Sequence, residues 1–312
     1  MTKYSPKTYD ELKELVSNLQ INLGDIDTSL ITDMAELFTE SERIDFAGIE
    51  NWDVSNVESL FCTFQGCIKF NADLSKWNVS NVTNMDNLFD CCYSFNSDLS
   101  NWNTKNVESM QYTFSNCKAF NSNLSKWNVS NVKSLVGCFI NCTNFNSDLS
   151  KWNVSSCDAF FNMFNGCSKF NSDLSNWNIS NAVDTSYMFY GCISFKSDLS
   201  KWDVSNVEDM TSMFEQCIAF DSDLNNWNVK KVLISNMMFS GCISFTGRIE
   251  NWDVSGLDEA YRMFNGCKRL STDFSKWKLY EGLNRTEDDY YDLFREVPLD
   301  DEFVEQLTSN ND

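Results

Sequence analysis

Residues 70–82 read FNADLSKWNVSNV, and this stretch recurs with few changes along most of the 312-residue chain. The ten tryptophans are spaced 25 residues apart without a slip, at Trp52, Trp77, Trp102, Trp127, Trp152, Trp177, Trp202, Trp227, Trp252 and Trp277. Nine of the thirteen cysteines keep the same period, from Cys67 to Cys267. A period of this length is typical of solenoid proteins, in which each repeat buries its apolar side against the next one.

The spacing of apolar residues within one repeat predicts its secondary structure. Leu74, Trp77 and Val79 follow a leucine-rich-repeat spacing that places Trp77 and Val79 on one face of a short strand. Residues 82–89 then carry apolar side chains at near-helical spacing, after a Ser-Asn pair suited to a helix N-cap. We therefore expect an α/β fold, a leucine-rich-repeat-type right-handed solenoid of about ten 25-residue coils. Each coil would hold one short parallel strand and one short helix, with helical caps at both ends.

Departures from the period predict the domain boundaries. Residues 1–44 are expected to form an amino-terminal cap helix and a degenerate first repeat that lacks both Trp and Cys. Residues 45–280 would hold the regular repeats. After Trp277 the period ends, and residues 281–312 are expected to form a carboxy-terminal cap.

Composition excludes several classes of function. The net charge of −21 argues against nucleic acid, which needs a basic surface, and disfavours anionic membranes. No apolar run is long enough to span a membrane, and the first residues do not resemble an export signal. The chain has no histidine, and its carboxylates repeat in equivalent positions rather than in contrasting pairs. We therefore expect no enzymatic activity, no catalytic residues, no cofactor and no metal site.

The periodic placement and odd number of cysteines favour free, buried thiols over a disulfide framework. Free thiols are typical of a reducing compartment, so the sequence as written predicts a cytoplasmic location.

An acidic column lies four residues before most of the tryptophans: Asp73, Asp98, Asp148, Asp173, Asp198, Asp223 and Asp273. In a stacked solenoid, these like charges would lie about 5 Å apart, which is unfavourable unless it is offset. We expect each carboxylate to accept backbone N–H groups within its own turn. The alternative is a row of weak calcium sites, although Asn123 and Arg248 interrupt the column.

Variation between repeats is concentrated on the predicted helix. Aromatic residues occur unevenly there, and they predict a partner-binding surface at Phe61, Tyr112, Phe161, Tyr187 and Tyr261. The alternative is that these positions are loosely constrained and half covered by neighbouring helices. We expect a monomer that binds a protein or glycan partner and therefore serves as an interaction scaffold.

The pattern M-F-x-G-C-x-x-F-N-x-D-L-S-x-W-N-V-S-N-V, best matched from Met163 to Asn181, resembles the BspA-like leucine-rich repeats. The resemblance covers about residues 45–280, and it is to the 25-residue variant common in mycoplasma lipoproteins and bacterial surface proteins, a domain of unknown function. It implies a leucine-rich-repeat solenoid and an alternative function as a surface adhesin or host-interaction protein that binds a host protein or glycan. It also implies a location at the cell surface or outside the cell.

Overall fold

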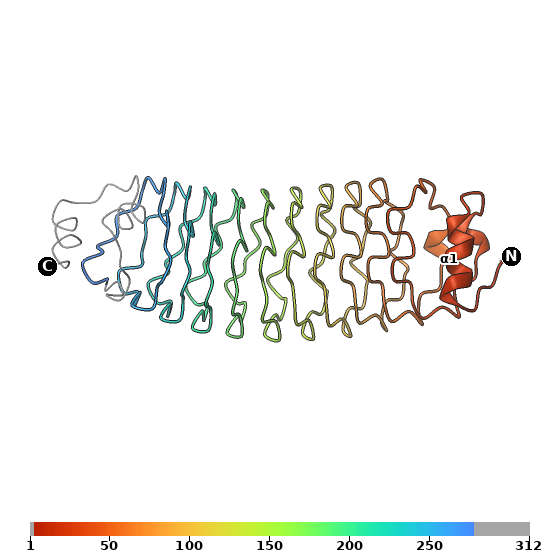
Figure 1. Ribbon diagram of the computed structural model, residues 1–312, viewed down its shortest axis with the longest axis horizontal. Helices are drawn as coiled ribbons and strands as arrows, with labels where there is room; N and C mark the ends of the chain where they lie inside the picture. Colours follow the sequence, from red (N-terminus) through yellow and green to blue (C-terminus); the bar gives the residue numbers. More distant parts are fainter. Residues whose placement is uncertain (1–2, 278–312) are drawn as a thin grey trace. The chain divides into compact units, whose positions relative to one another are not determined.

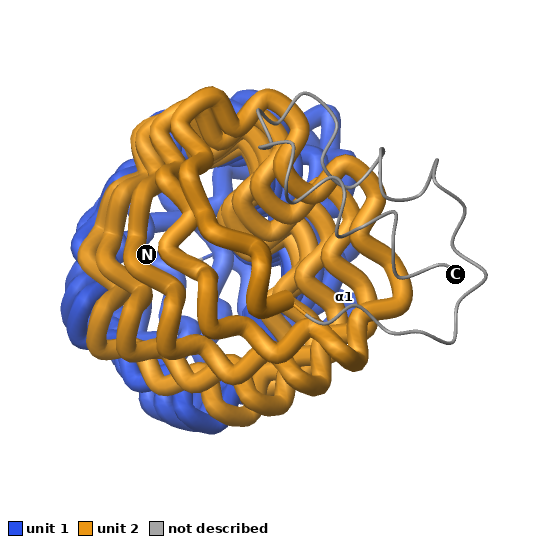
Figure 2. Tube along the Cα trace, turned by 90° about the vertical axis from the view of Figure 1, so that its left-hand side faces the viewer, with its two compact units in different colours: residues 1–157 blue, residues 158–312 orange. Residues whose placement is uncertain are grey.

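The structure is a computed structural model that describes residues 3–277. The chain divides into two compact units, residues 1–157 (unit 1) and residues 158–312 (unit 2). Within each unit the chain winds in successive coils, and Figure 2 shows coils of one unit following nearly the same path. Equivalent residues of neighbouring coils therefore lie side by side, as a repeat solenoid requires. The handedness of the coils stays a prediction, and the predicted carboxy-terminal cap at 281–312 lies outside the described residues.

Unit 1 begins with the helix α1 (Tyr9–Ser17), which Figure 1 shows beside the first coils. The N-cap residue Thr8 accepts the backbone N–H of Glu11 through its hydroxyl oxygen, as N-cap residues do. The helix buries Leu12 and Val16. On the side facing the first coil, the ammonium of Lys13 donates to the carbonyls of residues 36 and 37, at 2.7 and 2.8 Å. α1 therefore covers both apolar side chains and backbone acceptors of that coil.

Two short 3₁₀ helices follow in unit 1, η1 (Leu23–Asp25) and η2 (Ile49–Asn51). They contact each other through a close approach of two glycine backbones. Gly48 has a φ of 97°, and a Cβ built on it would lie 2.5 Å from the Cα of Gly24. Only glycine fits there, because any side chain would overlap the neighbouring backbone.

The predicted strand and helix of each coil are wrong. Within residues 3–277, α1, η1 and η2 are the helical elements, and the strand-type pairing consists of isolated parallel bridges. Apart from Tyr4–Ile26 near the amino terminus, the bridges lie in the segment that was expected to be helical, not at the tryptophans. In unit 1 they link Asp33–Ser59, Ser59–Asn84, Asn84–Ser109 and Ser109–Ser134. In unit 2 they link Ala159–Asp184, Asp184–Asp209, Asp209–Ile234 and Ile234–Glu259.

The segment that replaces the helix is a run of turns, which we call the turn ribbon (residues 59–66 and their equivalents in other coils). Alternate N–H groups point in two directions. Those of Cys62 and Gly66 donate to carbonyls of the next coil, at 2.9 and 2.8 Å, whereas those of Thr63 and Gln65 donate three residues back within the coil. Cys62 and Gly66 have positive φ, 52° and 74°, and this reverses the chain after each turn. Repeated three-residue turns produce an apolar spacing close to that of a helix, and this is why the helix prediction failed.

The segment predicted as a strand is also a turn, and side chains link it to its neighbours. The backbone N–H of Trp77 bonds back to the Leu74 carbonyl at 3.1 Å, and that carbonyl also accepts the indole N–H of Trp102 at 2.9 Å. The same indole-to-carbonyl bond joins neighbouring coils in both units, for example Trp127 to Leu99 and Trp252 to Leu224. A buried indole N–H needs such a partner.

Phenylalanine and cysteine columns complete the core. Paired rings of one coil stack closely, as at Phe89 and Phe95, whose centroids lie 3.9 Å apart. The thiol of Cys92 donates to the carbonyl of Phe64 in the preceding coil at 3.0 Å. The prediction of buried cysteines is confirmed for all but Cys91, which is half-buried. Burial raises the pKa of Cys67 to about 11, so these thiols stay protonated at neutral pH.

The close approach of Gly48 and Gly24 gives a testable contrast with Gly191, whose φ is 68° but whose Cβ would meet nothing nearer than 3.8 Å. Gly191→Ala is expected to cost about 1 kcal/mol of unfolding free energy, from the left-handed backbone alone. Gly48→Ala should cost about 3 kcal/mol or more, because steric overlap with the Gly24 backbone is added. Urea unfolding followed by tryptophan fluorescence measures both, and equal losses would contradict the close approach.

Candidate functional site

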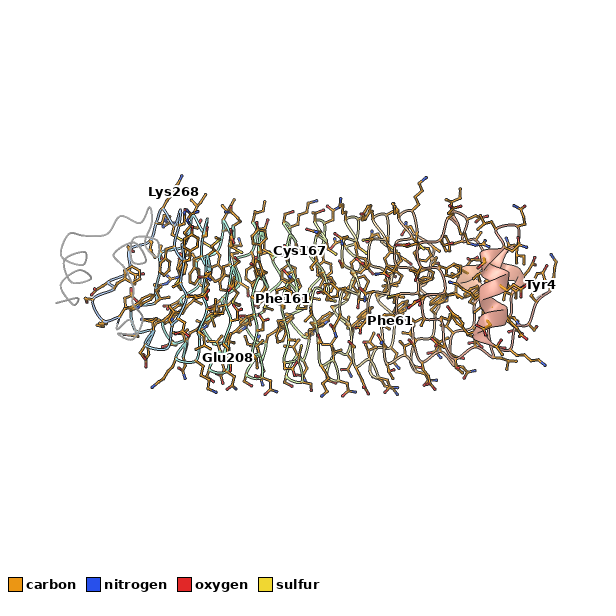
Figure 3. The ribbon with its side chains drawn as sticks, viewed as in Figure 1. Tyr4, Phe61, Phe161, Cys167, Glu208 and Lys268 are labelled. Carbon is orange, nitrogen blue, oxygen red and sulfur yellow. The ribbon has the colours of Figure 1, made fainter. Side chains whose placement is uncertain are left out.

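The predicted partner-binding residues lie on the outer side of the turn ribbon, not on a helix. Four of them are half-buried: Phe61, Tyr112, Phe161 and Tyr187. Tyr261 is 41% exposed. Figure 3 labels Phe61 in unit 1 and Phe161 in unit 2. The outward side chains of the turn ribbons form the surface that we call the ribbon face.

Unit 2 brings two of the predicted residues together and adds a third. The rings of Phe161 and Tyr187 meet edge to face with centroids 6.0 Å apart. Tyr187 also contacts Tyr190, at 6.1 Å. Tyr190 lies outside the five residues that the sequence predicted. The column that starts at Gln65 holds polar residues in most repeats, and the tyrosine in it was the available signal.

The other predicted residues are not brought into this cluster. In unit 1 Tyr112 lies over Gly137, where an added Cβ would overlap its ring. Phe61 is two repeats earlier in the sequence than Tyr112. In unit 2 Tyr261 has the guanidinium of Arg262 over its ring, 4.8 Å from the centroid. The structure therefore gives one aromatic cluster, and the remaining residues stay individual candidates.

The backbone explains the variation at the repeat position that Tyr112 and Tyr187 occupy. Its members all have positive φ, between 50° and 59°, so every residue type there adopts the left-handed conformation. Side chains of very different size occupy this position: Cys62 and Ser212 are buried, whereas the larger Tyr187 is half-buried. The members are Cys62, Asn87, Tyr112, Gly137, Asn162, Tyr187, Ser212, Met237 and Arg262. Tyr187 thus lies in a turn with a left-handed backbone conformation. This conformation costs about 1–2 kcal/mol for a non-glycine residue, and the surrounding hydrogen bonds must offset that cost.

The aspartate column consists of turn residues, as predicted. The carboxylate of Asp98 accepts the backbone N–H of Ser100 at 2.9 Å, and Asn123 holds Ser125 in the same way at 3.0 Å. Ser100, through its N–H and its hydroxyl, lowers the pKa of Asp98. Among residues 3–277, no group of three or more cysteines, aspartates or glutamates is arranged to hold a metal ion. The hydrogen bonds to backbone N–H groups account for these side chains as turn-forming residues.

No helix in the described part of the chain is both long and apolar enough to span a membrane.

Turn ribbons, indole-to-carbonyl bonds and stacked phenylalanines together define a solenoid protein of 25-residue repeats. The family model described as "Mycoplasma protein of unknown function, DUF285" matches residues 8–127, 109–217 and 188–288. The chain belongs to this family.

Three solved structures are similar at low identity and low TM-score. The TLR13–ssRNA13 complex is 14% identical over 92% of this chain, with a TM-score of 0.24, and the match covers 47% of that chain. A leucine-rich-repeat protein of T. pallidum is 12% identical over 53% of this chain and 72% of its own, with a TM-score of 0.25. A leucine-rich cell-surface protein of Faecalibacterium prausnitzii is 12% identical over 86% of this chain and 80% of its own, with a TM-score of 0.27. No curated protein shows significant similarity to the chain.

The turn role of Asp98 can be tested with two substitutions. Asp98→Ala removes the acceptor for the Ser100 N–H and should cost up to about 1 kcal/mol at pH 7, whereas Asp98→Asn should cost less, because its amide oxygen keeps the acceptor, as at Asn123, and only the charge is lost.

The pKa of Asp98 is lower in the folded chain, so its ionised form stabilises the fold above the unfolded value of about 3.9. This contribution is lost as the pH falls through the folded pKa. Urea midpoints of wild type and Asp98→Ala should therefore converge between about pH 5 and pH 2. A gap that stays constant across this range would exclude the ionised carboxylate as its source.

Proposed function

We propose that the chain is a non-enzymatic interaction scaffold that binds a protein partner through the ribbon face. The observation that carries this proposal is the half-buried aromatic cluster of Phe161, Tyr187 and Tyr190 in unit 2. Tyrosine and phenylalanine are enriched at the centres of protein interfaces, where a few anchors supply most of the binding energy. The backbone under two of these anchors is held by hydrogen bonds: the N–H of Tyr187 donates to the Thr211 carbonyl of the next coil at 2.8 Å, and that of Tyr190 donates to the Tyr187 carbonyl at 3.1 Å. Little ordering entropy would therefore be lost on binding.

The surroundings of the cluster have the composition of an interface rim. Further along the ribbon face of unit 2, Glu215 accepts a hydrogen bond from the Ser212 hydroxyl at 2.6 Å, and burial raises its pKa. Glu208 is exposed at the edge of the same coil. An apolar centre bordered by hydrogen-bonded and exposed polar groups matches the usual anatomy of a protein interface.

The absence of histidine and the equivalent settings of the aspartates support a role without catalysis. General acid–base chemistry needs groups whose environments differ, so that one holds a proton while the other accepts one. The aspartate column instead repeats one environment: Asp73, Asp98 and Asp148 each accept the N–H of a serine two residues later at 2.9 Å.

The resemblance to BspA-like repeats supports a related alternative, in which the same face binds a host protein or a glycan at a cell surface. Aromatic rings pack against sugar rings as well as against protein side chains, so the aromatic cluster is compatible with either partner. The test below therefore includes both.

Phe161→Ser combined with Tyr187→Ser is expected to reduce partner capture about tenfold. The measurement is quantitative mass spectrometry of proteins captured by the intact chain, with a glycan array as the second arm. Phe61→Ser, Tyr112→Ser and Tyr261→Ser are tested singly, because these residues lie outside the cluster.

The matched control is Ile218→Ser combined with Ile243→Ser, which removes exposed apolar side chains elsewhere in unit 2. A protein captured by wild type and control but lost by the cluster variant supports the proposal. Binding to a glycan alone, or equal capture by all variants, would contradict a protein-binding ribbon face. Unfolding midpoints verify that each variant remains folded.

A further inference from the structure

The first coil of unit 1 contains a loop that is longer than its counterpart in later coils. The loop lies between Glu40, the second residue of that coil with a positive φ, and the core residue Phe46. Glu40 and Gly66 are equivalent, because both have positive φ and both donate their N–H to the next coil. Phe46 and Phe70 are also equivalent, because each packs on the preceding phenylalanine of its own coil. Six positions separate Glu40 from Phe46, whereas only four separate Gly66 from Phe70. Residues 41–45 therefore form a longer loop than their counterpart in the next coil.

Arg43 fixes this loop from the inside. Its side chain is buried, and its guanidinium donates to the carbonyls of Val16 and Asn18 at the end of α1, at 3.1 and 2.9 Å. It also donates to the carbonyls of Ile21 and Asp45. The Val16 carbonyl is one of those that a helix end leaves without an intrahelical partner, whereas the Asn18 carbonyl also accepts the Ile21 N–H at 3.0 Å. Because Arg43 points inward, the next residue, Ile44, faces outward and is 78% exposed.

The loop forms one wall of an open groove of about 640 Å³, which we call the cap groove. The rest of the lining comes from the turn-ribbon ends and corners of the next two coils, residues 65–69, 90, 91 and 93. Three of the six large apolar side chains that the described part of unit 1 exposes line this groove: Ile44, Ile68 and Tyr93. Such convergence is unusual for scattered surface residues and is typical of a binding surface.

Three carboxylates line the groove beside these apolar side chains, Glu40, Glu42 and Asp90, together with one exposed cation, Lys69. Glu40 and Glu42 are exposed, and among residues 3–277 neither carboxylate has a hydrogen-bond or ion-pair partner. The carboxylate of Asp90 is half-buried and is oriented by amide groups of Gln65 and Asn116, at 3.2 and 3.3 Å. The ring of Tyr93 already holds the Lys118 ammonium 4.9 Å from its centroid, so its face accepts a cation.

We propose that the cap groove binds a basic peptide segment in which Arg or Lys alternates with aliphatic residues. Aliphatic side chains of the segment contact Ile44, Ile68 and Tyr93, and its cations pair with Glu40, Glu42 and Asp90. Charge complementarity selects this occupant, because a net charge of −21 attracts cationic partners and repels a second copy of the chain. The site goes beyond the proposed ribbon-face function, since it uses other residues and specifies the chemistry of the partner.

Fluorescence anisotropy with the full chain tests the proposal, using labelled peptides of about nine residues. One peptide alternates Arg and Leu, a second replaces Leu with Ser, and a third replaces Arg with Glu. The Arg–Leu peptide is expected to bind at least about tenfold more tightly than either of the others. Equal binding of the Arg–Ser peptide would show diffuse charge attraction and would overturn the proposal, as would the absence of binding by the Arg–Leu peptide.

Two double variants locate the site. Ile44→Ser with Ile68→Ser should weaken Arg–Leu binding about tenfold, and Glu40→Gln with Glu42→Gln should weaken it about fivefold and reduce its salt dependence. All four side chains are exposed, so the variants should fold normally. Ile218→Ser with Ile243→Ser is the control for the isoleucine variant, and Glu58→Gln with Glu108→Gln is the control for the glutamate variant. All four control residues are exposed and lie outside the cap groove. Both control variants should stay within about twofold of wild type.

Controls that weaken binding as much as the groove variants would overturn the proposal. Sedimentation that shows a dimer lost on Ile44→Ser with Ile68→Ser would also overturn it, by assigning the groove to self-association. Phe161→Ser with Tyr187→Ser should leave peptide binding unchanged, so failure of the cap groove and failure of the ribbon face are distinguishable.

Discussion

Within each unit, the hydrogen bond from a buried indole N–H to a carbonyl of the preceding coil is the interaction on which the rest of the structure depends. The chain turns at every leucine–tryptophan pair, and a turn leaves carbonyls without sheet partners. The indole of Trp102 binds the Leu74 carbonyl at 2.9 Å, and its ring stacks on Trp127 at 5.9 Å. The buried indole N–H thus gains the partner that it needs, at a carbonyl that also accepts the Trp77 N–H, and the ring fills the core; a buried donor without a partner would be costly.

Other polar columns follow the same rule. The amide of Asn81 donates to the Ser55 carbonyl of the preceding coil at 2.7 Å, and the hydroxyl of Ser97 accepts the Leu74 N–H of the preceding coil at 3.0 Å. The thiol of Cys92 donates to the Phe64 carbonyl. Each of these side chains must reach a backbone group of the preceding coil at a fixed distance along the sequence. The insertion of one residue in a coil would therefore move all of these side chains away from their partners. The constant period of 25 residues follows from this requirement, and it leaves only outward positions free to vary.

Much of this could be predicted from the sequence, because the period reveals which residues stack. The buried cysteines and the aspartate turns followed from residue type and placement. The strand and helix of each coil could not be predicted correctly, because apolar spacing does not distinguish successive three-residue turns from a helix. Left-handed positions were hidden as well, since residues such as Tyr112 and Met237 occupy them instead of glycine. At the candidate site, Phe161 and Tyr187 were found from column variation, whereas the cap groove depends on a loop whose extra length shows only once core phenylalanines are aligned.

Hydrogen exchange of the indole N–H groups tests the central claim most directly. In a chain labelled with ¹⁵N-tryptophan and assigned by single Trp→Phe variants, the indole protons of Trp102, Trp127 and Trp227 should exchange at least about a hundredfold more slowly than those of free tryptophan. Slow exchange is expected because each proton is buried and bonded to a carbonyl of the preceding coil. Exchange of these protons at the rate of free tryptophan under native conditions would contradict the indole-to-carbonyl bond as the link between coils.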